Sequence, residues 1–201
     1  MCYSKISFIY AILNPIYMSN IFLIHGSYGN PDENWFPWLK QELEKLNLEV
    51  ITPTFPTPEN QSLTTWMHAF EPYQDKITNN TIFIGHSLGP AFILNLLQTK
   101  KAKAAFFVAP FLGSINNPDF DNINKTFMTN LDWNRIQQNC QNFQIFYSDN
   151  DPYVPKEKAE EIANHLNTTP NLVNKAGHFN KAAGYTEFKE LLEEIKKEIK
   201  N

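Results

Sequence analysis

Short apolar runs alternate with longer amphipathic segments along most of the chain, and this alternation strongly constrains the fold. The short runs are almost continuous in apolar residues, as in strands that are covered on both faces. They occupy residues 21–26, 48–53, 81–86, 104–110, 143–148 and, more weakly, 171–176. Strands joined by amphipathic helices form βαβ units with parallel strands. The pattern predicts an α/β fold of three layers, with a mainly parallel sheet of about six strands and helices on both faces.

The segments between these runs carry helix signals. Expected helices span residues 32–47, 62–77, 88–100, 155–167 and 185–201. Ser62 is a suitable N-cap, Pro155 suits a first turn, and Pro72 is expected to end or kink its helix. Residues 111–133, in contrast, have weak periodicity and several turn residues, which predicts a lid or pocket-rim segment.

A chain of 201 residues can bury a sizeable core in one domain. Met18 immediately precedes the first apolar run, so we assign residues 18–201 to the domain and residues 1–17 to an N-terminal extension. Asn14 and Pro15 interrupt the apolar residues of that extension. It is too short to span a bilayer and is not followed by a cleavage site of the secretory type.

Charge and cysteine content narrow the class of protein. The net charge is −4 and no Lys/Arg cluster is longer than a doublet, which argues against nucleic acid or a membrane as a partner. Cys2 and Cys140 lie far apart without CxxC spacing, and the histidines show no metal-ligand spacing. We therefore expect a cytoplasmic protein, monomeric, with no metal and no cofactor.

The pentapeptide "GHSLG" at residues 85–89 matches the GxSxG pattern of a nucleophile elbow. An expected strand precedes it and an expected helix follows it, which is the setting that this motif requires. In such a turn Ser87 would project into a cleft at the carboxyl edge of the sheet. A tight turn that merely joins a strand to a helix would account for the same five residues.

A serine needs a base to take its proton, and the base needs an acid to orient it. Asp149 and Asp151 lie in "SDNDPYVP" after an expected strand, and His178 lies in "AGHFN" before the last helix. The chain order Ser, Asp, His is that of α/β-hydrolases. From the residues alone, either carboxylate is a candidate for the acid.

Four landmarks in this order resemble a known family. With "HGSYG" at 25–29, "GHSLG" at 85–89, "DPYVP" at 151–155 and "GHF" at 177–179, the chain resembles the small α/β-hydrolases related to retinoblastoma-binding protein 9. The resemblance covers nearly everything from Met18 onward. It implies Ser87 as nucleophile and His178 as base, and it favours Asp151 over Asp149 because the family's Asp-Pro pair falls on Asp151 and Pro152.

The remaining roles follow from the same cleft. The backbone N–H groups of Leu88 and Ser27 would form the oxyanion hole, with Tyr28 as a substitute for Ser27. Tyr28, Phe111 and Leu112 are candidates for the substrate pocket. His25 and His86 are expected to hold loops rather than react.

We expect a serine hydrolase of the carboxylesterase type that cleaves an ester or related acyl bond of a small molecule through an acyl-enzyme. Two alternatives remain open at this stage. An acyltransferase would differ only in the acceptor that follows acylation, and a binding or scaffold protein could keep the fold without the chemistry.

Overall fold

The computed structural model describes residues 19–200, which contain one six-stranded sheet in the order β2-β1-β3-β4-β5-β6. Every neighbouring pair of strands is parallel. The strands are β1 (Asn20–Ile24), β2 (Glu49–Ile51), β3 (Ile82–His86), β4 (Ala104–Val108), β5 (Asn142–Tyr147) and β6 (Asn171–Leu172). The sheet confirms the expected fold class. The interpretation of residues 1–17 as an extension lies outside the described residues.

The strand order reverses at β1. The chain passes from β1 to β2 on one side and then crosses to β3 on the other, so β1 and β3 are neighbours although β2 lies between them in sequence. In open parallel sheets a crevice forms at the carboxyl ends of the strands where the order reverses. Here the segments that leave those ends begin with His25 and Ser87.

Seven α-helices are present among the described residues. They are α2 (Phe36–Glu44), α3 (Leu63–Phe70), α4 (Gly89–Leu97), α5 (Pro118–Asn124), α6 (Trp133–Asn139), α7 (Lys156–His165) and α8 (Lys189–Lys200). The Ser62 side chain caps α3 by accepting from the Thr65 N–H at 3.1 Å. As expected from Pro72, α3 ends at Phe70, and the 3₁₀ helix η2 (Glu71–Lys76) replaces it.

Two differences from the sequence expectation have local causes. Helix α2 begins at Phe36 rather than at residue 32, because Asn34 adopts a φ of 54° that a right-handed helix does not allow. Helices α5 and α6 were not expected. Their N-caps, Asn117 and Asp132, accept hydrogen bonds from the first-turn backbone, which favours short helices without a clear apolar period.

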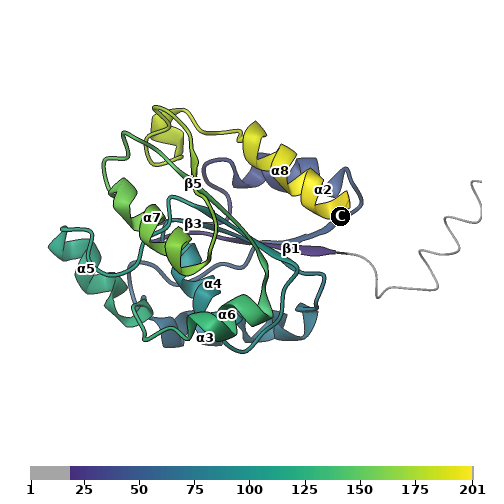
Figure 1. Cartoon of the computed structure of the whole chain (residues 1–201), viewed down its shortest axis with the longest axis horizontal. Coiled ribbons are helices and arrows are strands. Elements are labelled where there is room, and N and C mark those ends of the chain that lie inside the picture. The colour runs from purple at the N-terminus through teal and green to yellow at the C-terminus, as the bar shows by residue number, and fades with distance from the viewer. Residues whose placement is uncertain (1–18, 201) are drawn as a thin grey trace, which may run out of the picture.

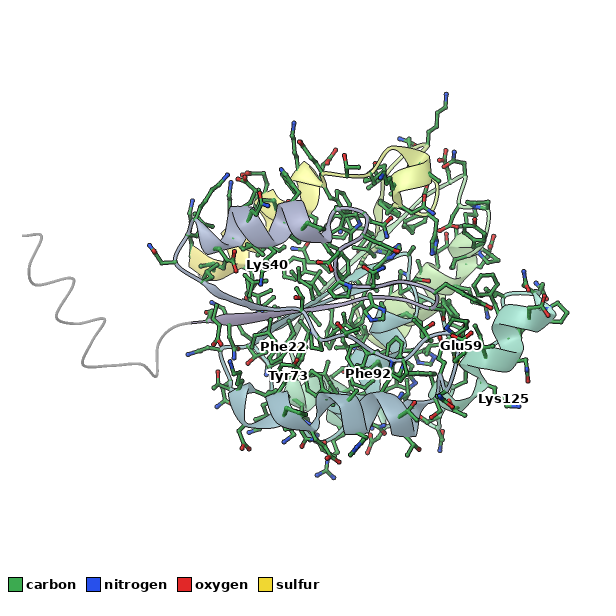
Figure 2. All side chains as sticks on the ribbon, turned by 180° about the vertical axis from the view of Figure 1, so that it is seen from behind. Phe22, Lys40, Glu59, Tyr73, Phe92 and Lys125 are labelled. Atoms are coloured by element: carbon green, nitrogen blue, oxygen red, sulfur yellow. The ribbon has the colours of Figure 1, made fainter. Side chains whose placement is uncertain are left out.

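The helices cover both faces of the sheet, in three layers (Figure 1). Alternate residues of each strand point to opposite faces, so Phe22 and Ile24 pack with the core that α3, α4, α6 and α7 cover. Ile21 and Leu23 pack with the core under α2 and α8. Figure 2 shows the same layers from behind, with Phe22 in the sheet between Lys40 on α2 and Tyr73 on the other face, where Tyr73 packs against the core.

Residues 111–133 contain α5 and the 3₁₀ helix η3 (Lys125–Phe127). Helix α5 stands at one end of the molecule, away from the N-terminal end of β1 (Figure 1). Within residues 19–200, no helix is long and apolar enough to cross a membrane.

Candidate active site

Ser87 occupies the turn between β3 and α4 in a strained backbone conformation. Its φ is 58°, in the left-handed region that residues other than glycine rarely adopt. The Ser87 N–H donates to the carbonyl oxygen of Val108 at 2.9 Å, which ties the turn to β4. Because α4 begins at Gly89, the turn has the strand-to-helix geometry that the GxSxG pattern predicts.

The two glycines of this motif are required by close contacts. A Cβ atom on Gly89 would lie 2.4 Å from the carbonyl oxygen of Ile24, and one on Gly85 would lie 2.7 Å from the backbone nitrogen of Pro90. Both contacts are with backbone, which cannot move aside as a flexible side chain would. The glycines therefore allow α4 to start directly against the end of β1.

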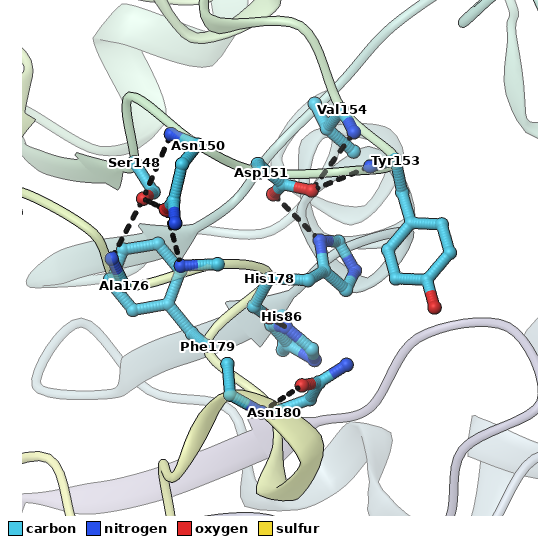
Figure 3. Close-up of polar contacts among 12 residues, drawn as sticks. His86, Ser148, Asn150, Asp151, Tyr153, Val154, Ala176, His178, Phe179 and Asn180 are labelled. Carbon is cyan, nitrogen blue, oxygen red and sulfur yellow. Dashed lines mark hydrogen bonds and ion pairs between the residues drawn. The ribbon is translucent and has the colours of Figure 1, made fainter.

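His178 and Asp151 are hydrogen-bonded to each other at the carboxyl edge of the sheet (Figure 3). The His178 Nδ1 atom lies 2.7 Å from Asp151 Oδ2, and the two side chains are 11% and 3% exposed. The other carboxylate oxygen, Oδ1, accepts from the N–H groups of Tyr153 and Val154 at 2.9 and 3.1 Å. These contacts leave the carboxylate fixed in a position where it can orient the imidazole ring.

A series of side-chain contacts holds the loop of His178 against the loop of Asp151. The Ser148 hydroxyl accepts from the Ala176 N–H at 2.9 Å, and Asn150 Oδ1 accepts from the Gly177 N–H at 2.8 Å (Figure 3). Asp149, the other candidate acid, accepts from the Lys175 N–H at 2.7 Å and is exposed. Asp149 thus contacts the backbone of this loop, whereas Asp151 contacts the imidazole.

His86 is buried beside His178 and is neutral. Burial, followed by the nearby His178, lowers the pKa of His86 to about 3. Its Nε2 atom lies 2.8 Å from the carbonyl oxygen of His178. Since a carbonyl can only accept, Nε2 carries the proton and donates it. His86 therefore supports the backbone at His178, the candidate catalytic histidine.

His25 has a similarly determined state. Its Nε2 accepts from the Phe55 N–H at 3.0 Å, so the ring proton lies on Nδ1, which donates to the Gly26 carbonyl oxygen at 2.8 Å. Burial lowers the pKa of this ring also. Both histidines bond to loop backbone, which is the role that was expected for them from the sequence.

The loop after β1 lies directly beside Ser87. A Cβ atom on Gly26 would be 2.7 Å from Ser87 Cβ and 3.2 Å from Ser87 Oγ. Neither the Ser27 N–H nor the Leu88 N–H donates to another described residue, whereas the Tyr28 N–H donates to Thr57 Oγ1 at 2.7 Å. Ser27 and Leu88 therefore offer free donors near Ser87, and Tyr28 does not.

A cavity of about 310 Å³ opens over these groups. Its polar wall includes Ser87, His178, Asn180 and the loop after β1. Its apolar wall is formed by Phe36, Phe111, Ile115, Phe120, Tyr153 and Val154.

Of the three expected pocket residues, Tyr28 and Phe111 line this cavity. Leu112 lies outside the cavity lining and packs, half-buried, against the core on the α4 side of the sheet. Trp35 and Trp66 do not line the cavity and are fully buried in the two cores.

Several residues of this site were not singled out from the sequence. Tyr153 and Val154 belong to the same "DPYVP" stretch as Asp151, so their place beside Asp151 in the sequence could have identified them as site residues. Ser148 and Asn150 precede Asp151 in the same loop. Asn180 follows the "GHF" landmark, and no motif marks it.

The part of the chain that the structure describes contains no group of three or more His, Cys, Asp or Glu residues placed to hold a metal ion. Cys140 is buried as a free thiol, and burial raises its pKa to about 12.

A family model and curated relatives match most of this chain. The family model described as serine hydrolase matches residues 21–197. The YdeN protein of Bacillus subtilis strain 168 is 25% identical over 170 residues, which cover 83% of this chain and 88% of that protein. Serine hydrolase RBBP9 of Rattus norvegicus is 24% identical over 163 residues, which cover 81% of this chain and 84% of that protein.

Solved structures show the same fold. The crystal structure of the ydeN gene product from B. subtilis has a TM-score of 0.84 at 22% identity and covers 92% of this chain and 100% of its own. Alpha/beta hydrolase domain-containing protein 10 from mouse has a TM-score of 0.65 at 14% identity. The match covers 90% of this chain and 89% of the mouse protein's chain.

Proposed function

Because the chain belongs to the serine hydrolase family, we propose that it hydrolyses carboxylic esters or closely related acyl bonds through an acyl-enzyme on Ser87. The observation that carries this proposal is the 2.7 Å contact between His178 Nδ1 and Asp151 Oδ2 in the wall of the cavity that Ser87 also lines. A serine, a histidine and a buried carboxylate in this arrangement are the parts of a nucleophilic triad.

In the proposed cycle the Ser87 oxygen forms a bond to the acyl carbon while its proton passes to His178 Nε2. Asp151 holds the ring with Nδ1–H toward the carboxylate and stabilises the imidazolium, and it does not itself take the proton. The imidazolium then gives its proton to the departing alcohol as the acyl–oxygen bond breaks. Water, deprotonated by the same ring, releases the acid and restores Ser87.

The oxyanion of each tetrahedral intermediate would be held by the N–H groups of Leu88 and Ser27. The support for this assignment is that both donors are free and that the Ser27 loop packs against Ser87. Leu88 is also the N-cap of α4, where the helix dipole favours negative charge. Each such donor is typically worth about 3 kcal/mol in the transition state.

The volume of the cavity indicates the size of the bound group. At about 310 Å³ it is at the small end of ligand sites, so we propose small to medium acyl groups as substrates. The cavity lining contains one carboxylate, Glu33, and no lysine or arginine. An uncharged ester is therefore a better fit than an anionic one.

The test uses a fluorophosphonate probe and p-nitrophenyl esters of graded acyl length. The wild type should label and should hydrolyse the short esters. Ser87→Ala should abolish labelling, and His178→Ala should lower turnover by about 10⁵-fold or more. His68→Ala is the matched control, because the side chain of His68 is 81% exposed and lies on α3.

A second pair of variants tests the choice of acid. Asp151→Asn should lower turnover by about 10⁴-fold, since the amide would favour the wrong tautomer of the ring. Asp149→Asn makes the same change in the same loop without touching the imidazole, and it should keep most of the activity. A folded wild type that neither labels nor hydrolyses any ester would contradict the proposal and favour a binding protein.

A further inference from the structure

The loop that carries Ser27 is held by a chain of side-chain hydrogen bonds that reaches well beyond the cavity wall. The Tyr28 N–H donates to Thr57 Oγ1 at 2.7 Å, and the Thr57 hydroxyl lies 2.5 Å from Gln61 Oε1. Gln61 Nε2 lies 3.0 Å from Ser27 Oγ and 2.7 Å from Asn124 Oδ1. The Ser27 hydroxyl donates to the same Asn124 oxygen at 2.7 Å. Gln61 therefore contacts three of the other four members.

The bonds of this chain have definite directions in the structure. A backbone N–H can only donate, so Thr57 accepts from Tyr28, and the Thr57 hydroxyl donates to Gln61 Oε1. The amide of Gln61 then faces Ser27 and Asn124, and it also lies 3.4 Å from the carbonyl oxygen of Ile123. Since Gln61 occupies one lone pair of Ser27 Oγ, the Ser27 proton points to Asn124.

The far end of the chain carries an energetic cost. Asn124 is 1% exposed, and its Nδ2 group is buried with no hydrogen-bond partner among the described residues. A buried amide left unpaired typically costs about 1–3 kcal/mol. The side chain thus serves as an acceptor for Gln61 and Ser27 at the expense of its own donor.

The chain also joins three segments that are distant in sequence. Ser27 follows β1, Gln61 precedes α3, and Asn124 ends α5. Figure 2 shows Glu59 and Lys125, neighbours of Gln61 and Asn124, at the same end of the molecule. Without Gln61, the loop of Ser27 would keep its bonds to Phe55, Thr57 and Asn124. It would lose the bond that the Gln61 amide donates to the Ser27 hydroxyl, which is its only hydrogen bond with Gln61 among the described residues.

From these contacts we infer that Gln61 is a positioning residue, which holds the Ser27 N–H toward the oxyanion without touching the substrate. This inference rests on the proposed function, since it assigns a cause to the geometry of one oxyanion donor. An N–H that serves the oxyanion acts in the transition state and little in the ground state. Loss of its alignment should therefore lower kcat and leave KM nearly unchanged.

The experiment compares Gln61→Leu with Gln61→Glu in the full chain, with p-nitrophenyl acetate as substrate. Gln61→Leu should lower kcat by about 10-fold to 100-fold, part of the effect of removing an oxyanion donor, with KM changed less than about 3-fold. Binding of a boronic acid inhibitor, whose tetrahedral adduct with serine places an oxygen in the oxyanion site, should weaken by a similar factor.

Gln61→Glu should recover most of the activity. A carboxylate accepts from Thr57 as the glutamine does, and the Asn124 amide can turn so that its unpaired Nδ2 faces the new acceptor. The matched control is Gln98→Leu. Gln98 is half-buried and accepts from the Asp132 N–H at 3.1 Å, but it lies outside the cavity lining.

The outcomes separate this inference from the proposed function. If the wild type is inactive, the proposed function itself fails and the inference fails with it. If the wild type is active and folded Gln61→Leu keeps the wild-type kcat, or loses no more than Gln98→Leu, the positioning role is refuted alone. If Gln61→Leu does not fold, Gln61→Met takes its place in the same comparison. A fall in kcat of about 10-fold or more with KM nearly unchanged then supports the role, and a wild-type kcat refutes it.

Discussion

The low pKa of His86 should make the stability of the protein depend on pH in a way that one substitution removes. In the unfolded chain this ring titrates near 6.5, whereas in the folded protein its pKa is about 3, chiefly because the ring is buried. Between these values the unfolded state binds a proton that the folded state does not. The contribution of His86 to the free energy of unfolding is therefore fully present above pH 6.5 and is lost as the pH falls toward 3.

The magnitude follows from the same shift. In this window the free energy of unfolding falls by roughly 1 kcal/mol for each unit by which the pH falls. The protonation of His86 in the unfolded chain should therefore lower the free energy of unfolding by about 2 to 3 kcal/mol at pH 4.5. That is a large part of the 5–15 kcal/mol that is typical of a single domain, as order-of-magnitude figures. His25, whose pKa is also lowered by burial, adds to the slope in the same direction.

His86→Gln isolates the contribution of one ring. Glutamine cannot titrate, but it offers an N–H donor for the carbonyl oxygen of His178. Urea unfolding, followed by tryptophan fluorescence, gives the free energy of unfolding at pH 7.5, 6.5, 5.5 and 4.5. Relative to their values at pH 7.5, the variant should lose about 2 to 3 kcal/mol less than the wild type at pH 4.5.

The contribution of His25 is common to both proteins and cancels in this comparison. His68→Gln, on the exposed face of α3, should run parallel to the wild type. Parallel curves for the wild type and His86→Gln down to pH 4.5 would refute the reasoning, since burial would then not keep His86 neutral.

Three further outcomes follow from local geometry. Gly26→Ala places a Cβ atom 2.7 Å from Ser87 Cβ, so hydrolysis of p-nitrophenyl acetate should fall by at least about 100-fold while the far-UV circular dichroism spectrum stays native. A variant with wild-type activity would show that the loop can move aside. Asn150→Ala removes the acceptor of the Gly177 N–H and should lower both kcat and the melting temperature. If both values stay unchanged, this contact does not support the loop of His178. Cys140, with its pKa raised to about 12, should be alkylated by iodoacetamide at pH 8 only after unfolding in urea, as measured by peptide mass spectrometry; rapid alkylation of the native protein would contradict its burial.

The parts of this molecule that could be predicted from sequence are those with a local pattern. Five of the six strands were expected from nearly continuous apolar runs, because a strand covered on both faces has no polar side. Strand β6, whose two residues are both exposed, was expected more weakly. The landmarks with Ser87, Asp151 and His178 each follow a strand, and parallel strands bring their carboxyl ends to one edge. Local motifs therefore predicted which residues the fold would bring to one edge of the sheet.

Other features depend on contacts between distant segments and have no local signal. Helices α5 and α6 are held by single capping side chains rather than by an apolar stripe, so periodicity did not reveal them. The contacts of Gln61 with Ser27 and Asn124 span 34 and 63 residues. Ser27 illustrates the difference: its backbone was expected to matter from its place after β1, whereas its side chain became relevant only through these contacts.

The states of the three cavity histidines show how burial and hydrogen bonding divide their roles. His25 and His86 each bond to backbone in a way that fixes the position of the single ring proton, and burial lowers the pKa of both. His178 instead faces a carboxylate, with Nδ1 2.7 Å from Asp151 Oδ2. Its ring centroid lies 4.8 Å from that of His86, so a charged His86 would repel an imidazolium at His178. In the proposed cycle, therefore, the neutrality of His86 lowers the electrostatic cost of the imidazolium at His178.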